Sequence, residues 1–351
     1  MKKTLALVLA AVMLLSLLSA CKSSADETPT VDPAETEQTT TPEETTPAEE
    51  QTSEEPQPSQ EELDQAAADN VAALIDAIYV QSRTDETDAQ CEAAKAAWDA
   101  LTDAQKELVE GDEASPDYFG LDTGDASLDD ARNQDEIGEN ELLVVSFGTS
   151  YNDSRVADIK GIEDALQAAY PDWSVRRAFT AQIIINHVQA RDGEKIDNMT
   201  QALDRAVANG VKNLVVQPTH LMHGAEYDEM CEAIEQYKDK FESVSIAEPL
   251  LGEVGSDATV INADKEAVAK AITAAAVADS GFESLDAAKD AGTAFVFMGH
   301  GTAHVAKVTY SQMQTQMQNL GYENVFIGTV EGEPEAVSYT HLRAHETSQD
   351  L

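Results

Sequence analysis

The sequence predicts an α/β protein with a doubly wound parallel sheet. From residue 141 onward, short apolar runs rich in β-branched residues alternate with stretches of helical period. Strands separated by helices of this length are joined by right-handed crossovers, and such crossovers produce a parallel sheet. Two of the apolar runs end in loops that contain histidine. Because open α/β sheets bind ligands beyond the carboxyl ends of their strands, the chemistry is expected at that edge.

The first α/β domain is expected over residues 141–285. Its strands are predicted at 142–147, 174–179, 214–216 and 244–247, and its helices at 153–170, 181–188, 195–208, 225–241 and 264–278. Residues 292–336 repeat the pattern once, with strand 294–298, helix 305–320 and strand 324–329. One crossover is too small to enclose a core of its own. We therefore interpret this segment as the start of a second, similar domain.

Residues 337–351 follow neither period, although they hold His341 and His345. This stretch resembles translated adapter sequence, and we predict a non-native tail. A short natural tail is the alternative. In the first case both histidines lack a role and the second domain is cut short.

Residues 1–21 have the features of an export signal. Two lysines precede a short apolar run, which ends in Leu-Ser-Ala-Cys at Cys21. This ending resembles a bacterial lipobox, in which the cysteine carries the lipid. We expect a lipoprotein held by Cys21 on the outer face of the cell membrane, and an ordinary cleaved signal with a chance cysteine is the alternative. Residues 22–60 are acidic and rich in Thr and Pro, which predicts a disordered linker.

Residues 61–112 predict a small helical module. Val71, Leu74, Ile75 and Ile78 recur at spacings of three and four, as on the buried face of a helix. Thr102, followed three residues later by glutamine, predicts a capping box at the start of a last short helix. Cys91 is expected in the seam between the helices. Residues 113–140, rich in Asp, Gly and Ser, are predicted to be a linker.

The composition excludes some functions. Twenty-two basic residues against 66 acidic ones give a formal charge of -44, which argues against binding of nucleic acid, since phosphates have to be neutralised by Lys and Arg. The three cysteines lie too far apart for a structural zinc site. Neither an organic cofactor nor a disulfide is expected, and the sequence leaves open whether identical subunits associate.

Histidine and glutamate follow two of the predicted strands. His220, His223 and Glu226 come after the strand at 214–216, and His300 comes after the strand at 294–298. Imidazole and carboxylate at one sheet edge are suitable ligands for a divalent metal ion. The sequence gives less reason to expect His223 and His304 to contact the metal ion. His187 is expected to be a packed or surface residue of a helix.

Four motifs occur in order in this part of the chain: LLVVSFGTSYNDSR, RRAFTAQIII, QPTHLMHGAEYDEM and FVFMGHGTAH. Together they resemble the anaerobic-type sirohydrochlorin cobaltochelatases, a branch of the class II tetrapyrrole chelatases. The resemblance covers residues 141 to about 335. It implies two similar α/β domains that face each other across a cleft for a tetrapyrrole.

The resemblance also implies roles for single residues. His300, in the Met-Gly-His-Gly motif, would be a metal ligand and the proton acceptor. Glu226 would be a second ligand, and His220 would line the cleft. The family's remaining metal-binding histidine lies in a Gly-Asp-His motif late in the second domain, and this sequence holds no such motif.

Sirohydrochlorin carries many carboxylates, so cations and backbone N–H donors are expected beside the cleft. The predicted substrate-binding residues are Ser146, Gly148, Thr149, Ser150 and Arg177. Arginines 155, 176 and 191 are also expected in loops or strand ends of the first domain. The alternative is that these arginines merely pair with acidic residues on the surface.

The resulting hypothesis is an exported enzyme that inserts Co²⁺, or else Fe²⁺ or Ni²⁺, into a sirohydrochlorin-like tetrapyrrole during anaerobic cobalamin biosynthesis. Insertion expels two pyrrole protons, and a neutral imidazole can accept them. The alternative is a surface-anchored protein that binds haem, another tetrapyrrole or metal for uptake without catalysis.

Overall fold

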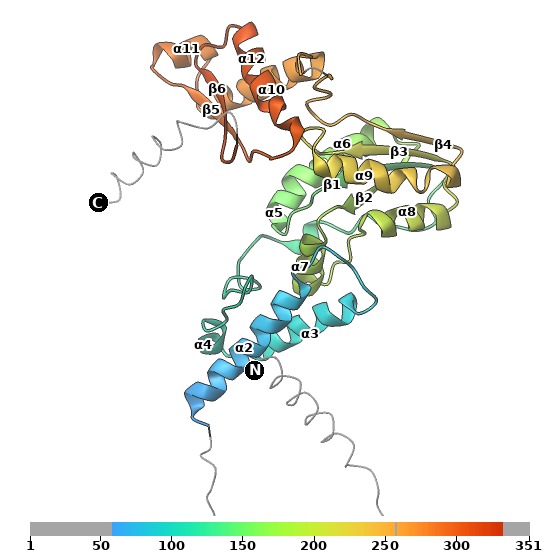
Figure 1. The fold of residues 1–351 in the computed structure, drawn as a ribbon, viewed down its shortest axis with the longest axis vertical. Coiled ribbons are helices and arrows are strands. Elements are labelled where there is room, and N and C mark those ends of the chain that lie inside the picture. The colour runs from blue at the N-terminus through green and yellow to red at the C-terminus, as the bar shows by residue number, and fades with distance from the viewer. Residues whose placement is uncertain (1–57, 257, 333–351) are drawn as a thin grey trace, which may run out of the picture. The chain divides into compact units, whose positions relative to one another are not determined.

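The structure is a computed structural model that describes residues 58–256 and 258–332 (Figure 1). The predictions for residues 1–21, including Cys21, for most of the linker at 22–60 and for the tail at 337–351 lie outside these ranges. Within the described ranges, every helix is too short or too polar to span a lipid bilayer.

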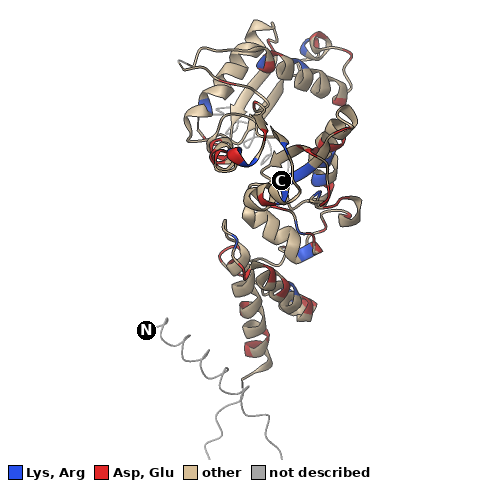
Figure 2. Ribbon diagram, turned by 90° about the vertical axis from the view of Figure 1, so that its right-hand side faces the viewer, with Lys and Arg blue, Asp and Glu red and all other residues tan. Residues whose placement is uncertain are grey.

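The helical module consists of α2 (Gln60–Ile78), α3 (Thr87–Ala100) and α4 (Asp103–Lys106). The capping box predicted at Thr102 is present and opens α4, and a second one at Ser59 opens α2. Ile75, Cys91 and Trp98 are buried in one apolar cluster. Cys91 therefore lies in the seam between the helices, as predicted. Acidic positions recur along these helices (Figure 2).

The module packs directly against helix α7 (Gln182–Asp192) of the α/β domain. Asn186 donates from Nδ2 to the Ile78 carbonyl at 2.9 Å, and the Cys91 thiol donates to the Asn186 carbonyl at 3.6 Å. His187 stacks on Tyr118, with ring centroids 4.1 Å apart, and its Nε2 lies 2.7 Å from the Tyr118 carbonyl oxygen. The module is therefore an integral layer of the fold rather than a free spacer.

The first sheet has four parallel strands in the order β2-β1-β3-β4, as the predicted crossovers require. The strands are β1 (Asn140–Ser146), β2 (Ser174–Phe179), β3 (Asn213–Pro218) and β4 (Ser243–Ile246). The helices between them, besides α7, are α5 (Asn152–Ser154), the π-helical η2 (Arg155–Lys160), α6 (Gly161–Ala169), α8 (Met199–Ala208), α9 (Ala225–Glu235) and the 3₁₀ turn η3 (Lys238–Lys240).

Helices cover both faces of this sheet. Leu143 and Val145 of β1 pack with Leu203 of α8 and Met230 of α9. The alternate residues of β1 face the other side, where Val144 clusters with partly buried Leu166 of α6. A strand with both faces buried explains the continuous apolar run that predicted it. The doubly wound fold is confirmed.

The second sheet has two parallel strands, β5 (Phe295–Gly299) and β6 (Val325–Thr329). It follows α10 (Ala263–Asp279) and α11 (Leu285–Asp290), and its strands are joined by the 3₁₀ turn η4 (Val305–Lys307) and α12 (Val308–Asn319). Helix α11 was not predicted. It is six residues long, capped by Ser284, and too short to show a helical period.

The segment predicted as a linker, 113–140, includes the 3₁₀ turn η1 (Ala126–Leu128) and is held against the first domain. The Asp129 side chain is 1% exposed and pairs with Arg155 at 2.9 Å and Arg177 at 2.7 Å. Burial alone would raise the pKa of Asp129, but the Arg177 guanidinium holds this pKa below its usual value.

Candidate functional site

Three residues singled out from the sequence line one cavity of about 480 Å³. His220 follows β3, Glu226 lies in the first turn of α9, and His300 follows β5. The cavity lies beyond the carboxyl ends of these strands, as expected for an open α/β sheet. Its other lining residues are Phe147, Leu221, Met222, Gly224, Ala225, Tyr227, Gly301, Thr302 and Tyr310. The two loops predicted from separate strands do meet.

The His220 side chain is only 7% exposed, and burial lowers the pKa of its imidazole. The ring is therefore neutral near pH 7. Neither Nδ1 nor Nε2 has a hydrogen-bond partner among the described residues. The nearest acid is Glu226, whose Oε2 lies 3.9 Å from His220 Nε2, too far for a hydrogen bond.

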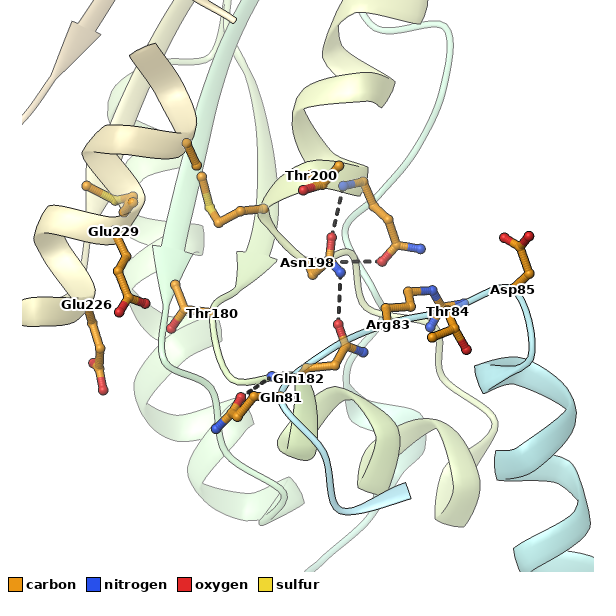
Figure 3. A pocket seen from close by; sticks show the side chains of 14 residues that line it. Gln81, Arg83, Thr84, Asp85, Thr180, Gln182, Asn198, Thr200, Glu226 and Glu229 are labelled. Atoms are coloured by element: carbon orange, nitrogen blue, oxygen red, sulfur yellow. Dashed lines mark hydrogen bonds between the residues drawn. The ribbon is translucent and has the colours of Figure 1, made fainter. Parts of the chain in front are cut away.

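Glu226 has a half-exposed side chain at the start of α9. Burial raises the pKa of its carboxyl, and the neighbouring negative charge of Glu229 raises it further. Glu226 also lines a second cavity, of about 550 Å³, next to the loop between α2 and α3 (Figure 3). Of the residues that the structure describes, it is the one that lines both cavities.

His300 is exposed, and its Nδ1 lies 3.3 Å from the Gly301 carbonyl oxygen. Gly301 has φ +93°, and a Cβ there would lie 1.7 Å from the Glu331 carbonyl oxygen, so this position requires glycine. The Glu331 N–H donates to the His300 carbonyl at 2.9 Å. Glu331 follows β6, which pairs with β5, and it contacts the His300-Gly301 turn through its backbone.

Apolar contacts join the two loops. Met222, from the loop after β3, is buried with Ala306 of η4 and Tyr310 of α12. Tyr310 accepts a hydrogen bond from the Gly301 N–H at 3.2 Å. His304 Nε2 lies 3.5 Å from Asp228 Oδ2. These contacts fix the spacing between the loops that carry Glu226 and His300.

No three side chains of His, Cys, Asp or Glu converge closely enough to enclose a metal ion within residues 58–256 and 258–332.

Residues 140–346 of the chain match the model of the family described as cobalt chelatase (CbiK). The chain belongs to the cobalt chelatase family. It is 30% identical to the sirohydrochlorin cobaltochelatase of Salmonella typhimurium (strain LT2) over 194 residues, which are 55% of this chain and 66% of that protein. It is 27% identical to the sirohydrochlorin cobaltochelatase CbiKC of Nitratidesulfovibrio vulgaris (strain Hildenborough) over 210 residues, which are 59% of this chain and 67% of that protein. The chain thus spans about two thirds of the length of these relatives.

In this cobalt chelatase family member, the loop after β1 contributes Phe147 to the cavity. Ser146 is buried and its hydroxyl accepts from Thr219 at 2.9 Å. The Thr149 hydroxyl accepts from the Tyr151 N–H at 3.1 Å, and the Ser150 carbonyl accepts from Arg191 at 2.6 Å. None of Ser146, Gly148, Thr149 and Ser150 is among the residues that line this cavity. Binding of substrate by these four residues stays a prediction.

The structure does not support the prediction that Arg177 binds substrate. Its side chain is fully buried, and it pairs with Asp129 and Glu163 at 2.7 Å each. These two carboxylates raise the pKa of Arg177 despite its burial. Arg155 shares the Asp129 carboxylate, and buried Arg176 lies 3.2 Å from Glu141. The alternative, in which these arginines pair with acidic residues, therefore describes them better. The acids, however, lie in the interior rather than on the surface.

His187, His223 and His304 lie outside the cavity lining. His187 is packed at the module, as expected. His223 Nε2 lies 2.5 Å from Glu248 Oε2, and its ring packs on Tyr227. His223 therefore lies in the same loop as His220 but already pairs with Glu248. It can serve as a control in substitutions of the histidines that line the cavity.

Proposed function

We propose that the protein inserts Co²⁺ into sirohydrochlorin or a closely related tetrapyrrole. Membership of the cobalt chelatase family supports the reaction, and the two relatives named above are sirohydrochlorin cobaltochelatases. The observation that carries the proposal is that His220, Glu226 and His300 line one cavity. Cobalt is the substrate metal here, and Fe²⁺ and Ni²⁺ are the competitors to compare with it.

The proposed chemistry balances one metal ion against two protons. Co²⁺ enters the macrocycle, two pyrrole N–H bonds break, and both protons leave for basic groups and then for water. His300 is exposed at the cavity, where its imidazole can accept a proton from the macrocycle. Glu226 would hold the metal through oxygen, and borderline nitrogen together with hard oxygen donors suits Co²⁺.

Insertion is measured by the change in the absorbance spectrum of the macrocycle. We expect His300→Ala and Glu226→Ala to abolish turnover. His223→Ala is the matched control, because it removes an imidazole of the same loop that is already paired with Glu248. Full turnover in both His300→Ala and Glu226→Ala would end the proposal. A spectral change limited to one equivalent per protein would indicate a carrier instead.

We also propose that the protein is a lipoprotein on the outer face of the cell membrane. The support is the sequence of residues 1–21, with a basic start, an apolar run and a lipobox-like ending at Cys21. Cells that express the full chain should incorporate labelled palmitate into it and retain it in the membrane fraction. Cys21→Ser should abolish the label, and unchanged labelling would refute the anchor.

A further inference from the structure

The second cavity, of about 550 Å³, has residues of α9 on one side and residues of the helical module on the other. Figure 3 shows Glu226 and Glu229 on the first side and Arg83, from the loop between α2 and α3, on the second. The module therefore forms one wall of a space that Glu226 of the proposed insertion site also lines. The family match begins at residue 140, so this wall lies outside it.

Arg83 carries the positive charge that a tetrapyrrole with carboxylate side chains needs. Among the described residues that line this cavity or the neighbouring cavity of about 480 Å³, Arg83 is the only lysine or arginine. The other arginines that the sequence predicted near the cleft pair with neighbouring acids: Arg155, Arg176, Arg177 and Arg191. A carboxylate of a substrate in these cavities is therefore expected to reach the guanidinium of the module.

The Arg83 side chain is held in position but keeps donors for a ligand. It is 19% exposed, pairs with Asp88 and donates from Nη1 to Gln189 Oε1 at 3.4 Å. A guanidinium has more N–H groups than these two contacts use. Asp88 does not depend on Arg83 alone, because Lys195 and Gln189 each donate to it at 2.8 Å. The guanidinium can therefore bind a carboxylate in the cavity without leaving Asp88 unpaired.

The walls of the cavity are fixed by hydrogen bonds. The Gln182 N–H donates to Gln81 Oε1 at 3.1 Å, and Asn186 Nδ2 donates to the Ile78 carbonyl at 2.9 Å, so the loop between α2 and α3 is tied to α7. Thr180 also lines the cavity, and its buried hydroxyl has no hydrogen-bond partner among the described residues (Figure 3). Buried hydroxyls are rarely left without a partner, and this one can donate to an oxygen atom of a ligand.

We propose that Arg83 binds a peripheral carboxylate of the tetrapyrrole and so makes the helical module part of the substrate site. This inference rests on the proposed function for the identity of the substrate. The acids Asp85 and Glu229 also line the cavity, but both are exposed, so solvent and salt screen their charges. The centre of the macrocycle would then meet Glu226 while one acidic side chain extends toward the module. Arg83 thereby selects macrocycles that carry a carboxylate at this position.

The test is a titration of the full chain with sirohydrochlorin in the absence of Co²⁺, followed by the absorbance of the macrocycle. We expect Arg83→Gln to raise the Kd about tenfold, the loss expected for one charge-assisted contact. Arg83→Lys should restore part of the affinity. Lys195→Gln is the matched control, because it removes another cation that pairs with Asp88 but does not line the cavity. Its Kd should equal that of the unchanged protein.

Asp88→Asn separates substrate binding from a purely structural role of the ion pair. It breaks the same pair but leaves the guanidinium in the cavity, so the Kd for sirohydrochlorin should stay unchanged. An equal loss of affinity in Arg83→Gln and Asp88→Asn would show that the pair only supports the module, and would overturn the inference. If Arg83→Gln binds sirohydrochlorin as the unchanged protein does, the inference is wrong even where Co²⁺ insertion continues. If binding depends on Arg83 but insertion never follows, the proposed function fails while the carboxylate contact stands.

Discussion

The packing of His187 predicts that the helical module loosens in acid. Its imidazole stacks on Tyr118 and lies 2.7 Å from that residue's carbonyl oxygen. Burial lowers the pKa of His187 from 6.5 to about 4, and the positive charge of Arg191 contributes. In the unfolded chain the imidazole keeps its ordinary pKa. Below pH 6.5 the imidazole is therefore protonated in the unfolded state while it stays neutral in the folded state.

The size of the effect follows from linkage. Stability is fully present above pH 6.5 and is lost as the pH falls toward 4, because the unfolded state takes up the proton first. This difference in the pKa of His187 between the folded and unfolded states lowers the free energy of unfolding by about 2.5 kcal/mol between neutral pH and about pH 4.5. His187 is partly exposed, so we expect a loss closer to 2 kcal/mol.

The assay is urea unfolding at a series of pH values, read by tryptophan fluorescence. The chain has two tryptophans, and Trp173→Phe leaves Trp98, in the core of the module, as the reporter. His187→Gln keeps a donor for the Tyr118 carbonyl but does not titrate. Carboxylates such as Asp88 titrate in both proteins, so the difference between the two curves isolates His187. Parallel stability curves over this pH range would refute the reasoning.

Three further predictions concern stability. Gly148→Ala should cost about 1–3 kcal/mol, because φ at this position is +101° and a Cβ would lie 2.5 Å from the Phe179 ring, and thermal unfolding measures the loss. Arg177→Met should cost about 3–5 kcal/mol, since it removes a buried guanidinium shared by Asp129 and Glu163, which keep only Arg155 and Arg132 as partners among the described residues; an unchanged urea midpoint would contradict it. Asp76→Asn should cost about 1–2 kcal/mol and loosen the turn at 112–114, whose three backbone N–H groups donate to Asp76, as faster hydrogen exchange there would show.

The fold was largely predictable because its strands are apolar runs of ordinary length. The run Leu214–Val216 lies in the centre of β3, and the predicted helix at 264–278 is α10 with its ends moved by one residue. The six-residue helix α11 was not predicted, because it depends on the Ser284 cap and on burial of Ala288 rather than on a repeat of apolar residues at helical spacing. Long-range packing of the module onto α7 left no local signal.

The site was predictable in part. The rule that ligands bind beyond strand ends placed Glu226 and His300 at one cavity, although they are far apart in the chain. Arg177 was misjudged because its partners Asp129 and Glu163 lie 48 and 14 residues away, and no local pattern indicates that they meet. The isolation of the His220 ring could not be foreseen either, since burial and missing partners are properties of the folded chain.

The position of Asp129 limits where the protein can be shortened. The family match begins at residue 140, which invites a shortened protein that starts there. Such a protein would lack the carboxylate that neutralises two internal guanidinium groups, those of Arg155 and Arg177. Removing one partner of a buried pair costs about 3–5 kcal/mol, a large part of the stability of a typical domain. Expression of the catalytic region alone should therefore start upstream of Asp129.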